Sequence, residues 1–160
     1  MASSTPLMIL LMRHAEKLAD PMDPNLSNPG FARAAKLADY VPQTFGKPDF
    51  LFASAISKHS KRPYQTLKPL SDKVGIPVDT SYAEQDYGAL AQEILSDQKF
   101  KTKKAVIAWH HGNIPSFAKA LGAPAGKYPD PWDPEVFNLI LKFEWGDASG
   151  LGVTEVTEPF

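Results

Sequence analysis

The stretch Leu7-Met-Ile-Leu-Leu-Met-Arg-His14 decides the fold of this chain. Its six apolar residues, Leu7 to Met12, follow a proline without interruption, and this pattern is typical of a strand that is buried on both faces of a sheet. Such a strand usually lies near the centre of the sheet. Two further short apolar runs, Phe50–Ala53 and Ala105–Trp109, bring the number of predicted buried strands to three.

Helical periodicity fills the segments between these strands. One helix is predicted to begin after Ser27, which caps it, and to carry apolar residues from Phe31 to Val41 on one stripe until Pro42 stops it. Further helices are predicted over residues 62–74, 89–95 and 114–121. Strands that alternate with helical segments of this length need right-handed crossovers, which indicates a mainly parallel sheet covered on both faces.

The last third of the chain predicts additional strands. Residues from Phe137 to Phe143 alternate between apolar and polar, which is typical of a strand with one better-buried face. Residues 151–156 are expected to pair back on it as an edge strand after a turn at 146–150, and Val78 lies in a short strand. We therefore predict a single domain over residues 1–160 of the α/β class, a three-layer α/β/α sandwich around a mainly parallel central sheet.

Composition excludes several classes of site and partner. The 17 Lys and Arg residues against 18 Asp and Glu give a formal net charge of -1, so no overall positive field is available to hold nucleic acid or a lipid surface. The absence of cysteine excludes disulfides, zinc–thiolate sites and cysteine nucleophiles. The first apolar run is far shorter than the roughly 20 residues of a transmembrane helix, and no positively charged region precedes it as in a signal peptide. We expect a cytoplasmic protein without nucleic-acid or membrane partners.

Histidines follow two of the three buried strands. His14 comes after the first, and His110 and His111 come after the third. In a parallel sheet, functional groups gather in the crevice beyond the carboxyl ends of the strands, so imidazoles from neighbouring strands are expected to face one another there. Asn113, a little further along, is expected either to cap the following helix or to donate a hydrogen bond near the crevice.

Arginine usage points to a compact anion as the ligand of this crevice. The chain has 14 lysines but only three arginines, and a guanidinium binds phosphate or carboxylate oxygens in two places at once, which an ammonium group does not. Arg13 lies next to His14, and Arg62 follows the second strand. Arg33 has polar neighbours on the first helix and is expected to form a surface ion pair.

These residue types predict phosphoryl chemistry. The imidazole of His14 is largely neutral at pH 7 and can act as a nucleophile, while a second, protonated histidine would stabilise the charge on the phosphoryl oxygens. A leaving alkoxide needs a proton, and Glu84 and Asp86 are the candidate acids.

Four segments, in this order, resemble the motifs of the histidine phosphatase superfamily, whose fold is that of phosphoglycerate mutase. They are Arg13-His14-Ala15, Leu26-Ser-Asn-Pro-Gly30 followed by Arg33-Ala34, Arg62-Pro-Tyr-Gln-Thr66, and His111-Gly112 after a hydrophobic strand. The loop between Ser54 and Arg62 is longer than in the family pattern.

The resemblance implies roles for individual residues. His14 would become phosphohistidine, while Arg13, Arg62 and His111 hold the phosphoryl oxygens and neither a metal nor a cofactor takes part. His111 is preferred to His110 because a glycine follows it. The segment from Glu84 to Leu90 is similar to the one that supplies the acid of the mutase branch, which makes Glu84 the implied proton donor and leaves Asp86 as the alternative.

The expected function is therefore that of a metal-independent phosphatase acting on a small or protein-borne phosphate monoester. Within the enzymes, a phosphoglycerate mutase-type activity or a protein phosphohistidine phosphatase is an alternative. A module of the same fold that binds phosphate or serves as a scaffold with little turnover is the alternative outside them.

Overall fold

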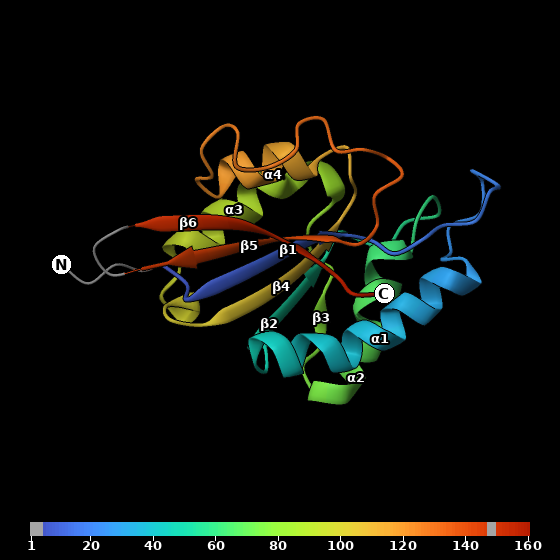
Figure 1. The fold of residues 1–160 in the computed structure, drawn as a ribbon, viewed down its shortest axis with the longest axis horizontal. Helices are drawn as coiled ribbons and strands as arrows, with labels where there is room; N and C mark the ends of the chain where they lie inside the picture. The colour runs from blue at the N-terminus through green and yellow to red at the C-terminus, as the bar shows by residue number, and fades with distance from the viewer. Residues whose placement is uncertain (1–4, 147–149) are drawn as a thin grey trace.

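A computed structural model describes residues 5–146 and 150–160 of the chain, and within them the elements form a sheet between two helical layers (Figure 1). The strands are β1 (Met8–Arg13), β2 (Phe50–Ala53), β3 (Val78–Asp79), β4 (Lys104–Trp109), β5 (Leu139–Trp145) and β6 (Leu151–Thr157). The helices are α1 (Asn28–Phe45), α2 (Arg62–Val74), α3 (Tyr87–Ser96) and α4 (Ile114–Ala120), with 3-10 turns η1 (Glu84–Asp86) and η2 (Gln98–Phe100).

The sheet has the order β3-β2-β4-β1-β5-β6 and is mainly parallel, as predicted. The first buried run, β1, lies between β4, with which it pairs in parallel, and β5, with which it pairs antiparallel. Strands β2 and β3 continue the parallel part, and β6 closes the other side as an antiparallel edge strand. The carboxyl ends of β1, β2 and β4 therefore meet at one edge of the sheet.

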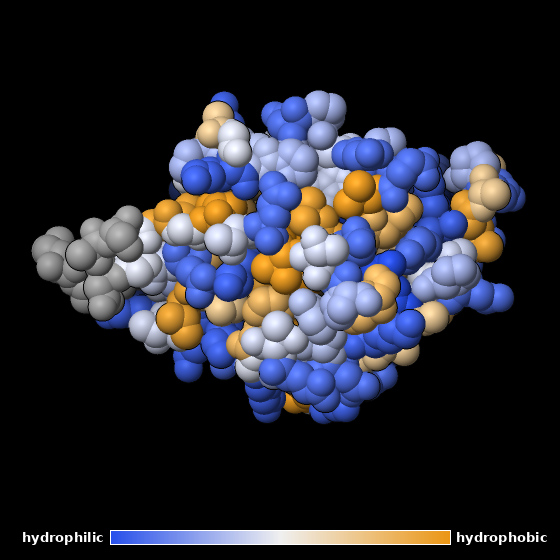
Figure 2. Space-filling model, in the orientation of Figure 1, coloured by the Kyte–Doolittle hydropathy of each residue, from blue (hydrophilic) through white to orange (hydrophobic). Residues whose placement is uncertain are grey.

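Each face of the sheet has its own core, which confirms the three-layer sandwich. Leu10 and Met12 of β1 pack in one core with residues of α1 and α2, and Ile9 and Leu11 pack in the other with residues of α3 and α4. The alternation within β1 divides its side chains between the two cores. On the face shown in Figure 2, hydrophobic residues reach the surface between the helical layers, while the helices present mostly hydrophilic residues.

Three local predictions need correction. Helix α1 runs through Pro42 to Phe45, because a proline removes only one backbone donor and the helix ends one turn later. Phe31 is 44% exposed and does not belong to the buried stripe of α1. Strand β5 begins at Leu139, so Phe137 lies in the segment before it.

Other sequence expectations hold. The Ser27 hydroxyl accepts a hydrogen bond from the Gly30 amide at 3.2 Å and caps α1. Strand β6 pairs with β5 along its whole length, from Leu151 to Thr157. The turn predicted at 146–150 has its middle, residues 147–149, outside the described part of the chain. Within the described part, no helix combines the length and the apolar character needed to cross a membrane.

Candidate functional site

The nucleophile candidate lies where β1 and β4 end together. Arg13 pairs in register with Trp109, and the backbone amide of His14 donates to the carbonyl of Trp109 at 3.0 Å. The next residue on each strand is a histidine, so the register places His14 beside His110. Their ring centroids are 5.4 Å apart, with the rings at 73° to each other.

Local hydrogen bonding fixes which nitrogen of His14 carries the proton. The Nδ1 atom lies 2.7 Å from the carbonyl oxygen of Ala15, and because a carbonyl only accepts, Nδ1 is the protonated nitrogen. The Nε2 atom therefore keeps its lone pair. Burial lowers the pKa of His14 to about 3, and the neighbouring charges of His110, Arg13 and Arg62 act in the same direction. The imidazole is neutral at physiological pH and has the form that a nucleophile requires.

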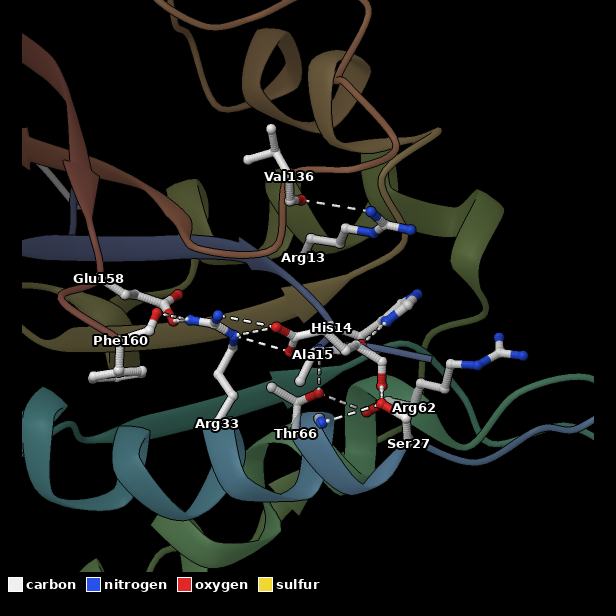
Figure 3. A network of polar contacts seen from close by, with 12 residues as sticks. Arg13, His14, Ala15, Ser27, Arg33, Arg62, Thr66, Val136, Glu158 and Phe160 are labelled. Carbon is white, nitrogen blue, oxygen red and sulfur yellow. Dashed lines mark hydrogen bonds and ion pairs between the residues drawn. The ribbon is translucent and has the colours of Figure 1, made fainter. Parts of the chain in front are cut away.

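Two arginines, Arg13 and Arg62, extend with His14 beyond the carboxyl end of β1 (Figure 3). Arg62 begins α2; its guanidinium donates to the carbonyl of Asp23 at 2.6 Å and to the hydroxyl of Ser60 at 3.3 Å. The Nε atoms of Arg13 and Arg62 are buried and have no hydrogen-bond partner among the described residues. Since a buried donor without an acceptor is costly, these two N–H groups suit an anion with several oxygens.

The Arg13 guanidinium is held from a second direction by the segment before β5. One of its terminal nitrogens donates to the carbonyls of Pro134 and Val136, the latter at 3.5 Å. Its carbon atom Cζ lies 3.8 Å from the centroid of the Phe137 ring. Burial lowers the pKa of Arg13 to about 10, so the group remains charged at physiological pH.

A hollow of about 350 Å³ is lined by Arg62 and by His110, the neighbour of His14. Residues 83–85 line a further part of it. The rest of the lining comes from the β2–α2 loop, namely Ala55, Ser57, His59 and Ser60. The long loop noted in the sequence therefore forms one wall of the hollow.

Glu84 is the predicted acid that reaches the hollow. One of its carboxylate oxygens lies 3.4 Å from Nε2 of His110, and its side chain is about half exposed. Its backbone carbonyl accepts hydrogen bonds from the indole of Trp109 at 2.8 Å and from the amide group of Asn113 at 3.1 Å. Asp86, the alternative acid, is exposed and is not among the residues that line the hollow.

The structure also locates two further predicted residues, His111 and Asn113. The register places His110 beside His14. His111, which the sequence favoured as the second catalytic histidine, lines another hollow with Asp130 and Trp132, and burial together with the charge of Arg13 lowers its pKa. Burial lowers the pKa of both histidines, and Glu84 opposes that shift at His110. Asn113 is at the N-cap position of α4, but its side chain makes no capping hydrogen bond. Its amide group donates instead to the backbone carbonyl of Glu84.

The loop after His14 is tied to α2. The amide of Ala15 donates to the hydroxyl of Thr66 at 2.9 Å, and that hydroxyl donates to the carbonyl of Arg62 at 2.8 Å. The residue after His14 and the start of the helix that carries Arg62 are thus connected through one side chain, that of Thr66.

The same loop is tied to α1 and to the residues after β6. Arg33 pairs with Glu16 at 2.9 Å and with the buried Glu158 at 2.8 Å, so the predicted ion pair exists but lies largely below the surface. The carbonyl of Glu16 accepts from the Ser27 amide at 2.9 Å. A Cβ atom added to Gly30 would lie 2.2 Å from that carbonyl oxygen, so the helix packs against the loop only because residue 30 is glycine.

Among the described residues, no group of three or more His, Asp or Glu side chains is arranged to hold a metal ion. The chemistry that this arrangement offers is nucleophilic attack by a neutral imidazole on a tetrahedral anion held by two guanidinium groups.

Comparison with known proteins places the fold. No protein-family model matches the sequence, and no curated protein matches it. Among solved structures, the protein histidine phosphatase SixA complexed with tungstate has a TM-score of 0.67 at 12% identity, covering 94% of this chain and 97% of that one. A phosphoserine phosphatase from Entamoeba histolytica in complex with phosphoserine has a TM-score of 0.61 at 13% identity, covering 92% and 95%.

A third structure agrees. The mycobacterial glucosyl-3-phosphoglycerate phosphatase has a TM-score of 0.57 at 14% identity and covers 95% of this chain and 98% of that chain. This chain has the histidine phosphatase fold. The histidine phosphatase fold, also described as phosphoglycerate mutase-like, is the one that the four sequence motifs indicated.

Nothing in the sequence indicated that Phe137 would contact this site. It fits the apolar and polar alternation that predicted the strand, and this alternation carries no signal that the residue would instead contact Arg13.

Proposed function

We propose that this protein is a phosphatase that hydrolyses phosphate monoesters through a phosphohistidine intermediate on His14, without a metal ion. One observation carries the proposal: His14 holds its proton on Nδ1 and presents a free Nε2 lone pair in the same cluster as two arginines with unpartnered Nε–H groups. A site that only binds phosphate has no need of a neutral, oriented imidazole beside the anion.

The first step transfers the phosphoryl group to the protein. Nε2 of His14 attacks phosphorus, an N–P bond forms, and the P–O bond to the leaving group breaks. Arg13 and Arg62 bind the equatorial phosphoryl oxygens, whose charge spreads as the transition state forms. We expect His110, whose ring lies beside that of His14, to donate a further hydrogen bond to one of these oxygens when it is protonated.

The leaving oxygen needs a proton, and Glu84 is the proposed donor. It lines the hollow where the leaving group would lie, next to Arg62 and His110. In the second step Glu84, now ionised, takes a proton from water, which attacks phosphorus; the N–P bond breaks, and inorganic phosphate is released. His14 returns to its neutral form.

The neighbouring structures support an oxyanion ligand for this fold. One was solved with tungstate, which is tetrahedral like phosphate, and another with phosphoserine. For this chain we propose a small or protein-borne phosphate monoester as the substrate and the cytoplasm as the location, with no nucleic-acid or membrane partner.

The test is the rate of p-nitrophenyl phosphate hydrolysis in excess chelator, compared between the unmodified protein and His14→Ala. We expect chelator-resistant activity that His14→Ala abolishes, together with an acid-labile phosphoprotein that only the unmodified protein forms. Lys68→Ala, at an exposed position of α2, is the matched control and should hydrolyse the ester like the unmodified protein. Phosphate binding without any hydrolysis by the unmodified protein would overturn the proposal in favour of the phosphate-binding module.

A further inference from the structure

We propose that Phe137 is a positioning residue of the phosphate site, which fixes the plane of the Arg13 guanidinium so that its free edge meets the phosphoryl oxygens. The inference rests on the proposed function in one respect, that Arg13 is a ligand of the phosphate group. It adds the side chain of Phe137 to the carbonyls of Pro134 and Val136, through which the same segment holds Arg13.

The contact geometry is that of a cation resting on an aromatic face. Cζ of Arg13 lies 3.8 Å from the centroid of the Phe137 ring, well within the roughly 6 Å at which such a pair attracts. The same ring lies 6.3 Å from the imidazole centroid of His14, tilted by 51°. Phe137 therefore contacts the arginine and also borders the nucleophile.

The ring holds the guanidinium without using any of its hydrogen-bond donors. The five N–H groups of a guanidinium lie in its plane, whereas the ring packs against its face. Within that plane, the carbonyls of Pro134 and Val136 accept hydrogen bonds from one terminal nitrogen of Arg13. The Nε atom has no partner among the described residues. One edge of Arg13 is anchored to protein and its face is covered by Phe137, while the buried Nε–H is left without an acceptor in the part of the chain that the structure describes.

Phe137 is itself held on both sides along the chain. The carbonyl of Val136 accepts a hydrogen bond from the indole of Trp132 at 3.0 Å. The carbonyl of Asn138 accepts from the amide of Glu158 at 2.7 Å. Because one neighbour is bonded within its own segment and the other to the residues after β6, the ring is in place before any ligand arrives. Preorganisation of this kind reduces the ordering cost of binding.

The contact with the Phe137 ring also helps to stabilise the positive charge of Arg13. Arg13 is buried, and a buried cation loses the hydration that stabilises it in water. The negative face of the ring replaces part of this stabilisation, and a cation–π pair contributes more in such a site than at an exposed one. A leucine at position 137 keeps the apolar volume but has no quadrupole and no flat face.

The experiment measures the affinity for inorganic phosphate by calorimetric titration, which requires no turnover. We expect Phe137→Leu to weaken phosphate binding about tenfold and to raise KM for p-nitrophenyl phosphate by a similar factor with a smaller change in kcat. Phe137→Tyr, which keeps the ring, should bind phosphate like the unmodified protein. Phe31→Leu, at an exposed phenylalanine of α1, is the matched control and should leave the affinity unchanged.

A double-mutant cycle separates positioning of Arg13 from a general effect on the fold. In an Arg13→Gln background, Phe137→Leu should weaken phosphate binding by less than about twofold, because the group that Phe137 positions is gone. The proposal is overturned if Phe137→Leu binds phosphate like the unmodified protein, if Phe137→Tyr weakens binding as much as Phe137→Leu does, or if the effect persists in the Arg13→Gln background. Phosphate binding that depends on Phe137 in a protein without hydrolytic activity would refute the proposed function and leave this inference standing.

Discussion

The imidazole rings of His14 and His110 meet edge to face with their centroids 5.4 Å apart. Parallel pairing of β1 with β4 produces this contact, because each histidine is the residue that follows the register pair Arg13 and Trp109. His111 is one position further along and lines a different hollow.

This contact predicts that the two adjacent histidines differ in importance. His110→Ala should lower kcat/KM for p-nitrophenyl phosphate at least about a hundredfold, because the transferring phosphoryl group loses a nearby donor. His111→Ala should change it by less than about tenfold. Steady-state kinetics of the two variants provide the check, and a larger loss from His111→Ala would contradict the placement.

The acids of η1 should also differ. Glu84→Gln is expected to lower kcat about 10²- to 10⁴-fold for an alkyl phosphate, whose leaving group needs a proton, and much less for p-nitrophenyl phosphate, whose leaving group does not. Asp86→Asn, two residues away but outside the hollow, serves as the control. Equal sensitivity of both esters to Glu84→Gln would rule out its role as the proton donor.

The pKa of His14 predicts how stability depends on pH. Its value of about 3 in the folded protein lies below the ordinary 6.5, so the folded state favours the neutral form more than the unfolded state does. The contribution of His14 to stability is therefore complete above pH 6.5 and is lost as the pH falls toward 3. Urea unfolding between pH 4 and pH 8 should show a smaller acid-induced loss for His14→Asn than for the unmodified protein. Parallel pH curves for the two proteins would show that His14 is not buried as described.

The same pKa bears on activity. Because His14 stays neutral over the range from pH 5 to pH 8, the acidic limb of a kcat/KM profile in that range should not reflect protonation of the nucleophile. Burial also lowers the pKa of His110, so we expect its titration on the acidic side of the ordinary histidine value. The profile of His110→Gln, measured with p-nitrophenyl phosphate, should then be flatter than that of the unmodified protein.

The close packing of α1 against the loop after His14 makes Gly30 a sensitive position. Gly30→Ala would place a methyl group 2.2 Å from the carbonyl oxygen of Glu16, and we expect a loss of about 2 kcal/mol in the free energy of unfolding, with reduced activity. Gly88→Ala, in α3 with no atom within 4 Å of the added Cβ, should be neutral or stabilising by about 0.5–1 kcal/mol. Denaturant unfolding of both variants tests the contrast, which fails if the two are equally stable.

The buried strands and the polar residues at their ends could be predicted from the sequence because both depend on short-range patterns. A continuous apolar run such as that of β1 indicates burial on both faces, and parallel strands bring their carboxyl ends to one edge. Arg13, His14 and Arg62 were placed together on this basis.

The parts that the sequence could not supply depend on register and on long-range packing. The choice between His110 and His111 rests on which residue of β4 pairs with Arg13, and a one-residue slip would exchange the two. Phe137 follows the same alternation as the β5 residues, but Asn138 and Phe137 lie before the strand and are placed by contacts with Glu158 and Arg13. Both contacts join residues that are far apart in the sequence, so no short sequence pattern predicts them.

Arg33 connects two parts of the chain that are far apart in the sequence. It contacts Glu16 across 17 positions and Glu158 across 125 positions. Contacts of large sequence separation form late because a long loop must close first. Glu158 and Phe160, the distant partners of Arg33, follow β6 at the end of the chain. The polar support of the loop after His14 is therefore complete only once the last residues of the chain have docked.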